Sequence, residues 1–580
     1  RSSWEDYNAK LMSKGGGIFS RSSKSIPVSK EMTALFELTV SKISPTDLMI
    51  AMLKAPVDLL WNGGIGTYVK ATSENHLDIG DKANDALRIN GNELRCKVIG
   101  EGGNLGFSQL GRIEYNLNGG RSFTDFIDNA GGVDCSDHEV NMKILLDEMV
   151  ANGDMTVKQR NSTLEKLTED VSELVLTNNY RQTQALGIAF TESFPRVEEY
   201  RRLIHNLEDA GKLNRELEFL PSDDLISERK ANGFGLTRPE LAVLISYVKG
   251  DLKEVLAKKE LANDDFIRGI VVTEFPTAMQ KKFGKMMNEH RLRKEIIATQ
   301  VANDMINYMG ITFFSRLHES TGASPIEAAK AYVASREIFG LHDLWAEIEA
   351  LDHQISADLQ SKMMLITMRM VRRSSRWLIK NFRSGIDIAN VIALFKQPLQ
   401  EMAGSLEQVL SPEQNDVWLA DAQKMIDVGV PESLAKRIAA ADLMYTSLGV
   451  VAVAQSLKRD SLAVANGYFR VGESLGLELF SRQVNSLKVM THWQAMARES
   501  FRDDLEWQQR RITQGLFIQM TETDQLETTV DRWLEDNKIL VDRWLRMMNE
   551  IRAVSEPEFS MYSVAIRELL DLSQATMPEL

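Results

Sequence analysis

The stretch Cys96-Lys-Val-Ile-Gly-Glu-Gly-Gly-Asn104 runs from a short apolar segment directly into a glycine-rich turn. An earlier stretch, Val57-Asp-Leu-Leu-Trp-Asn-Gly-Gly-Ile-Gly66, has the same form. Short runs of apolar and β-branched residues that end in glycine are typical of buried strands. Residues 73–90, which lie between the two stretches, have a helical pattern, and the order strand, helix, strand favours a parallel α/β sheet. We therefore predict neighbouring parallel strands over 57–61 and 96–100.

Glycine is concentrated in the first quarter of the chain. Seventeen of the 36 glycines lie between Gly15 and Gly132, and the other nineteen are spread over the following 448 residues. After about residue 135, apolar residues recur at the three- and four-residue spacing of helices. The sequence predicts an α/β head with a partial parallel sheet, followed by a large, mostly α-helical region. We expect three parts: residues 1–150, a helical connection over 151–220 and a helical domain over 221–580.

Length and composition limit the class of protein. The 580 residues are 43% hydrophobic and 26% charged, as in ordinary globular proteins with several cores. The net charge of −14 argues against binding of nucleic acid through overall charge. No run of about 18 uncharged apolar residues is present, so we expect no membrane span. The two cysteines form no CxxC pair and the eight histidines no HExxH motif, which favours a reducing, cytoplasmic compartment without a metal site.

Three loops rich in glycine and asparagine follow strand-like segments of the head. They cover residues 61–67, 100–104 and 128–133. Each alone is commonly an ordinary turn, but loops at the carboxyl ends of parallel strands line a ligand crevice, and three in order favour a binding site. After the third loop, Ser136-x-x-Glu139 has the pattern of a capping box. We expect Ser136 to begin the next helix, where free N–H groups would also attract a carboxylate.

Two features of the helical region allow more than one interpretation. Val530-Asp-Arg-Trp-Leu534 recurs as Val541-Asp-Arg-Trp-Leu545, an offset that returns to the same helix face after three turns. We expect two tryptophans packed on one seam rather than a recognition surface. Four arginines, Arg369, Arg372, Arg373 and Arg376, precede Trp377 on an expected helix. They could bind an acidic partner or a nucleic acid, but in an acidic protein a salt-bridged helix face is the better expectation.

The head motifs together resemble a known family. The run Lys97-Val-Ile-Gly-Glu-Gly-Gly-Asn104, with Asn129-Ala-Gly-Gly-Val133 and Ser136, is similar to the late part of the cofactor domain of glutamate dehydrogenases. The stretches 58–70 and 111–118 resemble one branch, the very large bacterial NAD-dependent enzymes with a long helical C-terminal region. Segments 290–297 and 312–317 of the helical region are similar to that branch as well. The resemblance implies a Rossmann-like sheet in the head.

The resemblance also implies roles for individual residues. Asn104 and Asn129 would lie on the nicotinamide side of NAD, and Gly63, Gly64 and Gly66 would form part of the cofactor rim. Val133 and Ser136 would contact the substrate side chain and its distal carboxylate. Position 103 is Gly where smaller relatives usually have Ala, and Thr124 stands where many have Pro, so the geometry of these loops is expected to differ.

Other motifs of the family are missing from this sequence. The lysine-bearing substrate motif, the acid/base aspartate and the GxGxxG loop would all precede Arg1, so the resemblance implies no catalytic residue within these 580 residues. We expect a piece of an oxidoreductase that converts L-glutamate to 2-oxoglutarate and ammonia with NAD, inactive by itself and homo-oligomeric when complete. Two alternatives stay open: a helical interaction or regulatory module with a remnant nucleotide-binding half-domain, and another amino-acid dehydrogenase.

Overall fold

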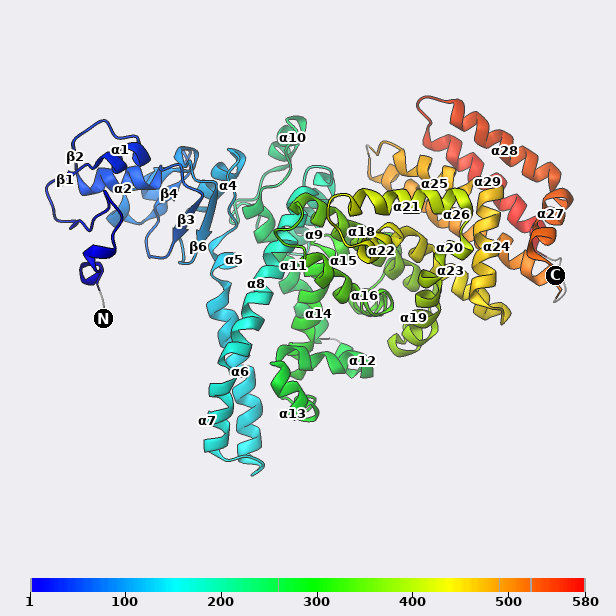
Figure 1. Cartoon of the computed structure of the whole chain (residues 1–580), viewed down its shortest axis with the longest axis horizontal. Coiled ribbons are helices and arrows are strands. Elements are labelled where there is room, and N and C mark those ends of the chain that lie inside the picture. The colour runs from blue at the N-terminus through cyan, green and yellow to red at the C-terminus, as the bar shows by residue number, and fades with distance from the viewer. Residues whose placement is uncertain (1–2, 259, 490, 522–523, 578–580) are drawn as a thin grey trace. The chain divides into compact units, whose positions relative to one another are not determined.

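The computed structural model describes residues 3–258, 260–489, 491–521 and 524–577 (Figure 1). The chain divides into two compact units, residues 1–315 and 316–580, and helices predominate in both. The expected parts 1–150, 151–220 and 221–580 stay a prediction. The mostly helical character expected after residue 135 is confirmed, since every described strand lies before residue 102.

The predicted parallel strands are present, each shifted by one or two residues. Strands β3 (Leu59–Asn62) and β6 (Val98–Glu101) pair in parallel, with Leu59 opposite Val98. A second parallel pair joins β4 (Val69–Lys70) and β5 (Ile89–Asn90). The remaining pair, β1 (Ile26–Pro27) and β2 (Lys42–Ile43), is antiparallel. The head therefore contains small parallel sheets, with both glycine-rich loops following paired strands.

The prediction of a helix over residues 73–90 is largely wrong. The segment contains only the short α3 (His76–Ile79) and the 3₁₀ turn Lys82–Asn84, and it ends in β5. Polar side chains explain the difference, because they bond backbone groups in non-helical conformations. Asp81 Oδ2 accepts hydrogen bonds from the Thr67 backbone N–H and the Asn84 side chain, and Arg88 Nε donates to the Thr67 carbonyl. These contacts fix an irregular connection between β4 and β5.

The expected helix start at Ser136 is also wrong. Helix α6 runs from Ala130 to Ala151, so Ser136 lies in its second turn and caps nothing. The glycines at 131 and 132, expected in a loop, are helical. Here the capping-box pattern reflects only two polar residues, Ser136 and Glu139, that lie three positions apart within a helix. By contrast, the spacing Thr237-x-x-Glu240, which has the same pattern, stands at a true helix start. Glu240 accepts hydrogen bonds from the Thr237 backbone N–H and hydroxyl at the first turn of α11 (Arg238–Lys258).

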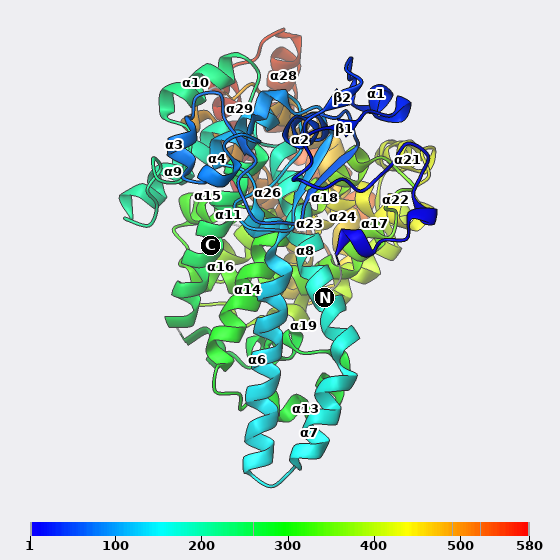
Figure 2. The ribbon, with the colours of Figure 1, turned by 90° about the vertical axis from the view of Figure 1, so that its left-hand side faces the viewer.

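The helices around α6 bring distant parts of the first unit together. Helix α8 (Thr168–Thr191) runs beside α6, and α7 (Val157–Lys166), which leads directly into α8, also packs on α6 (Figure 2). Helices α11 and α14 (Arg293–Met309) pack on each other and on α8. The other α-helices of this unit are α1 (Lys30–Phe36), α2 (Pro45–Leu53), α4 (Gln109–Leu117), α5 (Asp125–Asp128), α9 (Val197–Asp209), α10 (Asp223–Ala231), α12 (Asp265–Arg268) and α13 (Thr277–Met287).

The second unit is a helical assembly. Its described α-helices, after α15 (Phe313–Thr321) at the junction, are α16 (Pro325–Phe339), α17 (Leu341–Glu349), α18 (Ala357–Asn381), α19 (Ile388–Gly404), α20 (Leu406–Val409), α21 (Pro412–Ile426), α22 (Glu432–Ala439), α23 (Ala441–Leu457), α24 (Ser461–Ser474), α25 (Leu477–Ser486), α26 (His492–Gln519), α27 (Leu526–Asp536), α28 (Lys538–Ala553) and α29 (Phe559–Thr576).

No single helix in the described ranges is long and apolar enough to cross a membrane; the bent pair α22–α23 reaches that limit by length and composition alone.

The two tryptophans of the repeat are buried in one core, but on two helices. Trp533 belongs to α27 and Trp544 to α28, because the chain leaves the helix at Asn537. Trp533 Nε1 donates to the Thr576 hydroxyl and Trp544 Nε1 to the Leu475 carbonyl. The expected packing of the two tryptophans in a shared core is confirmed. The expectation that one continuous helix carries both is wrong.

Candidate functional site

The loops that follow β3 and β6 touch each other through backbone. The Gly103 N–H donates to the Asn62 carbonyl at 3.1 Å, and a Cβ added to Gly103 would lie 2.6 Å from the Gly64 carbonyl oxygen. Only glycine allows this approach. Gly66 needs glycine for another reason, a φ of +113°. The first two glycine-rich loops therefore form one surface at the carboxyl end of the strand pair.

A buried ion pair holds the end of β6 in place. Glu101 is 0% exposed and accepts two hydrogen bonds from the guanidinium of Arg112, at 2.6 and 2.8 Å. Asp125 and Asp128 of α5 accept the backbone N–H groups of Leu105 and Glu101. Burial raises the pKa of Asp128 to about 6. These contacts fix the loop carrying Asn104 against the start of α6.

Asn104 and Asn129 meet although 25 residues separate them. The Asn129 side-chain amide donates to Asn104 Oδ1 at 2.6 Å. This bond uses one N–H of Asn129 and one lone pair of Asn104, so the NH₂ group of Asn104 and the carbonyl oxygen of Asn129 stay available to another molecule. The family resemblance implies a common site for these two residues, and the structure brings their side chains together.

Both asparagines line a pocket of about 410 Å³ in the first unit. Its wall includes Val133 and Asp134 of α6, and it is completed by residues from α8, α11 and α14. Polar side chains are frequent there, and the lining consists of Asn104, Phe126, Asn129, Ala130, Gly131, Val133, Asp134, Asp137, Val175, Asn178, Asn179, Gln182, Lys249, Asn303 and Asn307. A pocket with many amides, one lysine and two aspartates suits a small polar ligand that carries charged groups.

Lys249 is the basic residue of this lining. Its ammonium donates to Gln182 Oε1 at 2.9 Å and forms no ion pair with any residue that the structure describes. Burial lowers the pKa of Lys249 to about 7, against the opposing effect of Asp134. A buried ammonium with only a neutral partner costs free energy that an anionic ligand would offset. Lys249 shares the pocket with the carboxylates of Asp134 and Asp137, but its ammonium forms a direct contact only with the neutral Gln182 side chain among the described residues.

A network behind α6 holds this side of the pocket. The imidazole of His138 is buried, and its Nδ1 lies 3.1 Å from Glu274 Oε1. Although burial opposes protonation, the Glu274 carboxylate raises the pKa of His138. Asn141 and Gln300 also donate to Glu274. Through Glu274, these contacts link α6 to Gln300 of α14. On the same side of the pocket, Asp134 of α6 accepts from Asn178 of α8 at 2.9 Å.

Of the other predicted residues, only Val133 belongs to the pocket lining. Val133 lines the pocket and is 69% exposed, while Ser136, three residues later on the same face of α6, is exposed outside the lining. The glycines at 63, 64 and 66 lie on the adjoining loop surface and are not part of the lining. The predicted set therefore spreads from the pocket onto an open face. Among the described residues, no cluster of His, Cys, Asp and Glu could hold a metal ion.

Lys249 was missed by sequence reasoning. It follows the apolar run 241–245 and reads as an ordinary polar position of an amphipathic helix. The sequence of α11 alone gives no sign of a site at this lysine. Its place in the pocket depends on α6, α8 and α14, which enclose it in the folded chain.

Comparison with known proteins identifies the class. Residues 1–189 match the family described as bacterial NAD-glutamate dehydrogenase, catalytic domain, and residues 233–571 match glutamate dehydrogenase, C-terminal. The chain belongs to the glutamate dehydrogenase family. The pocket draws on both matched regions, since Asn104, Asn129 and Val133 lie in the first and Lys249 and Asn303 in the second.

Three curated relatives carry the name NAD-specific glutamate dehydrogenase. The protein of Pseudomonas aeruginosa is 51% identical over 576 residues, that of Halomonas elongata 47% over 575, and that of Mycobacterium tuberculosis 36% over 582. In each case the match covers 99% of this chain and 36% of the relative. The chain therefore spans about a third of the length of these proteins.

Proposed function

We propose that this chain forms one wall of the active site of an NAD-dependent enzyme that oxidatively deaminates L-glutamate. The reaction takes glutamate, NAD⁺ and water to 2-oxoglutarate, ammonium, NADH and a proton. The observation that carries the proposal is the pocket, where Asn104, Asn129 and Val133 meet the unpaired ammonium of Lys249. The head would be the late part of a Rossmann-like cofactor domain, in a cytoplasmic homo-oligomer. Its two unpaired cysteines suit a reducing compartment.

The residues present fit one side of NAD. The free donor of Asn104 and the free acceptor of Asn129 complement a carboxamide, which itself carries one acceptor and one donor. The close loops at Gly64 and Gly103 allow a ligand to approach backbone. We therefore assign Asn104 and Asn129 to the nicotinamide side, and the glycines at 63, 64 and 66 to the cofactor rim. When bound, NAD would accept the hydride from the substrate α-carbon.

The substrate would lie along α6. Val133 would contact the methylene groups of glutamate, and the Ser136 hydroxyl would donate to its distal carboxylate. Lys249 would supply the positive charge that a carboxylate of the substrate requires, and it would attract the dianion 2-oxoglutarate as well. Proton transfer would depend on groups outside this chain. The chain alone is therefore expected to oxidise no glutamate, since a cleft with one wall positions no reacting atoms.

A chimaera tests the proposal. This chain replaces the matching segment of the Pseudomonas aeruginosa relative, and NADH formation is measured with glutamate, leucine and phenylalanine. We expect glutamate-dependent activity within about tenfold of the parent, and none from the 580-residue chain by itself. A folded chimaera without glutamate activity, or one that prefers leucine or phenylalanine, would contradict the proposal, as would robust activity of the isolated chain.

A further inference from the structure

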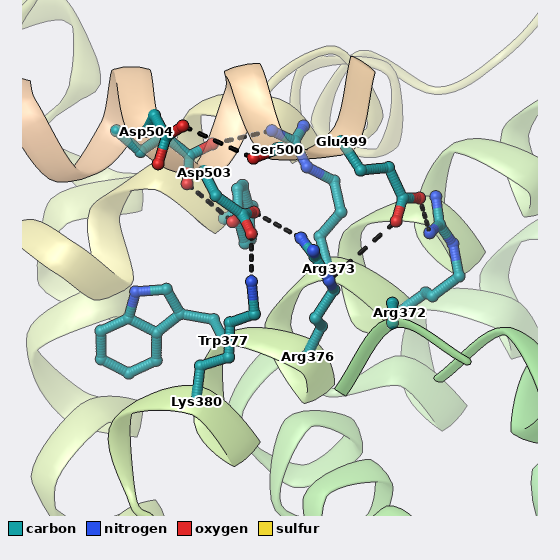
Figure 3. Close-up of polar contacts among 12 residues, drawn as sticks. Arg372, Arg373, Arg376, Trp377, Lys380, Glu499, Ser500, Asp503 and Asp504 are labelled. Carbon is teal, nitrogen blue, oxygen red and sulfur yellow. Dashed lines mark hydrogen bonds and ion pairs between the residues drawn. The ribbon is translucent and has the colours of Figure 1, made fainter. Parts of the chain in front are cut away.

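Three of the four arginines that precede Trp377 on α18 are paired within the second unit. They bind acidic side chains of α26, and the pairs are Arg372 with Glu499, Arg373 with Glu506 and Arg376 with Asp503 (Figure 3). The expectation of a salt-bridged helix face is confirmed for these residues. By contrast, the pocket of the first unit is lined by opposite charges that, among the described residues, form no ion pair with each other.

Two of these charged side chains converge on one face of α8. Asn178 of α8 donates to Asp134 Oδ2 at 2.9 Å, and Gln182 accepts from the Lys249 ammonium at 2.9 Å. Residues four positions apart lie on the same face of a helix, about 6 Å apart along its axis. The two amides therefore hold an anion from α6 and a cation from α11 near each other but apart. The Asp134 carboxylate is close enough to oppose the effect of burial on the pKa of Lys249.

The network behind α6 leaves the charge of Asp134 in place. His138 Nε2 lies 3.7 Å from Asp134 Oδ1, and Nδ1 of the same imidazole lies 3.1 Å from Glu274 Oε1. One imidazolium between two carboxylates leaves one negative charge in excess. The Asn141 and Gln300 amides, which also bind Glu274, are neutral. Burial raises the pKa of Asp134, so a cationic group of a ligand would stabilise its ionised form.

The second aspartate of the lining has different surroundings. Asp137 is exposed, so water solvates its carboxylate. Only 29% of the Asp134 side chain is exposed, and Asn178 and His138 each contact one of its two oxygens. A cation is attracted more strongly to a fixed, poorly solvated carboxylate than to one in water. Asp134 is therefore the acidic group of this pocket best suited to bind a cation.

We propose that Asp134 binds the α-ammonium group of glutamate and that Lys249 binds the adjacent α-carboxylate. An amino acid carries these opposite charges on one carbon, so it would bridge two side chains that the fold keeps apart. 2-Oxoglutarate keeps both carboxylates but has a neutral carbonyl in place of the ammonium. Asp134 would thus distinguish the amino acid from the oxo acid, whereas Lys249 would bind both. This assignment rests on the proposed function, because it orients the substrate in the same pocket.

Asp134→Asn in the chimaera, measured in both directions of the reaction, tests the assignment. Asparagine keeps an oxygen that can accept from Asn178, so the variant should fold normally. The Michaelis constants for glutamate and for ammonium should rise about tenfold or more, because a charge-assisted hydrogen bond to the ammonium group is lost. The constant for 2-oxoglutarate should change less than about twofold. Lys249→Met should instead raise the constants for glutamate and 2-oxoglutarate together.

Asp147→Asn is the matched control, because Asp147 lies on the same helix and pairs with Arg160 outside the pocket lining. It should leave all three constants unchanged. Asp134→Ser removes the same charge and decides the question if the asparagine variant does not fold. An unchanged glutamate constant in a folded Asp134 variant, or an equal rise for glutamate and 2-oxoglutarate, would overturn this assignment alone. A parent chimaera without glutamate activity would overturn the proposed function and the assignment with it.

Discussion

A substitution of Ser136 can test its proposed contact with the substrate without disturbing the fold. It is exposed in the second turn of α6, so its replacement removes no cap and no buried contact. Ser136→Ala in the chimaera should leave the melting temperature unchanged, or raise it slightly, since alanine favours helices. The Michaelis constant for glutamate should rise about ten- to a hundredfold, because a hydrogen bond to a charged group contributes about 1.5–3 kcal/mol. An unchanged glutamate constant would remove Ser136 from the substrate site.

Lys249 gives a pH-dependent prediction. Its pKa is about 7 in the folded chain, against an ordinary value of 10.5. The unfolded chain therefore binds more protons between about pH 7 and 10, and this residue makes stability rise with pH in that window. Lys249→Met should be more stable than the parent by about 1–3 kcal/mol at pH 6, after allowance for partial exposure, with the advantage disappearing towards pH 10.

Thermal unfolding at pH 6, 8 and 10 measures this difference. Lys253→Met is the matched control, because Lys253 is exposed four residues later on the same helix. It should change stability little at any of the three values. A Lys249→Met variant that is equally destabilised at every pH would contradict the lowered pKa.

At the scale of elements, Asp128 links α5 to the end of β6. Its pKa is about 6 in the folded chain and 3.8 ordinarily, so the folded chain binds more protons between about pH 4 and 6. This residue therefore makes stability fall as pH rises through that window. Asparagine keeps the oxygen that accepts the Glu101 N–H. Asp128→Asn should stabilise the chain by about 1–2 kcal/mol at pH 7.5 and not at pH 4.

Denaturant unfolding of the isolated chain at the two pH values checks this prediction. The parent chain measured under the same conditions is the reference. Destabilisation by Asp128→Asn at pH 7.5 would mean that the ionised carboxylate, and not merely its oxygen, is needed at this contact.

Sequence patterns predicted the elements that local residues determine. The strands at 57–61 and 96–100 were predictable because apolar runs ending in glycine have few other conformations. The segment 73–90 was not, since its shape depends on Asp81 and Arg88 reaching the backbone of Thr67. The start of α6 was misplaced because Gly131 and Gly132 read as a loop, whereas packing of α6 on α8 keeps them helical. Tertiary contacts decided both cases.

At the scale of the whole chain, the site was only half predictable. Asn104, Asn129 and Val133 follow from loops that carry a recognisable pattern, and they line the pocket. Lys249 and Asn303 come from helices whose sequences give no sign of a site. They line the pocket because α11 and α14 pack against α8. The helical region would thus contribute directly to the substrate pocket rather than only support it.

The Michaelis constants of the chimaera carrying Lys249→Met test this account most directly. The account predicts a glutamate constant raised about tenfold or more, an NAD constant changed less than about twofold, and normal folding, with Lys253→Met like the parent. An unchanged glutamate constant in a folded, active Lys249→Met enzyme would contradict the claim that this pocket is the substrate wall.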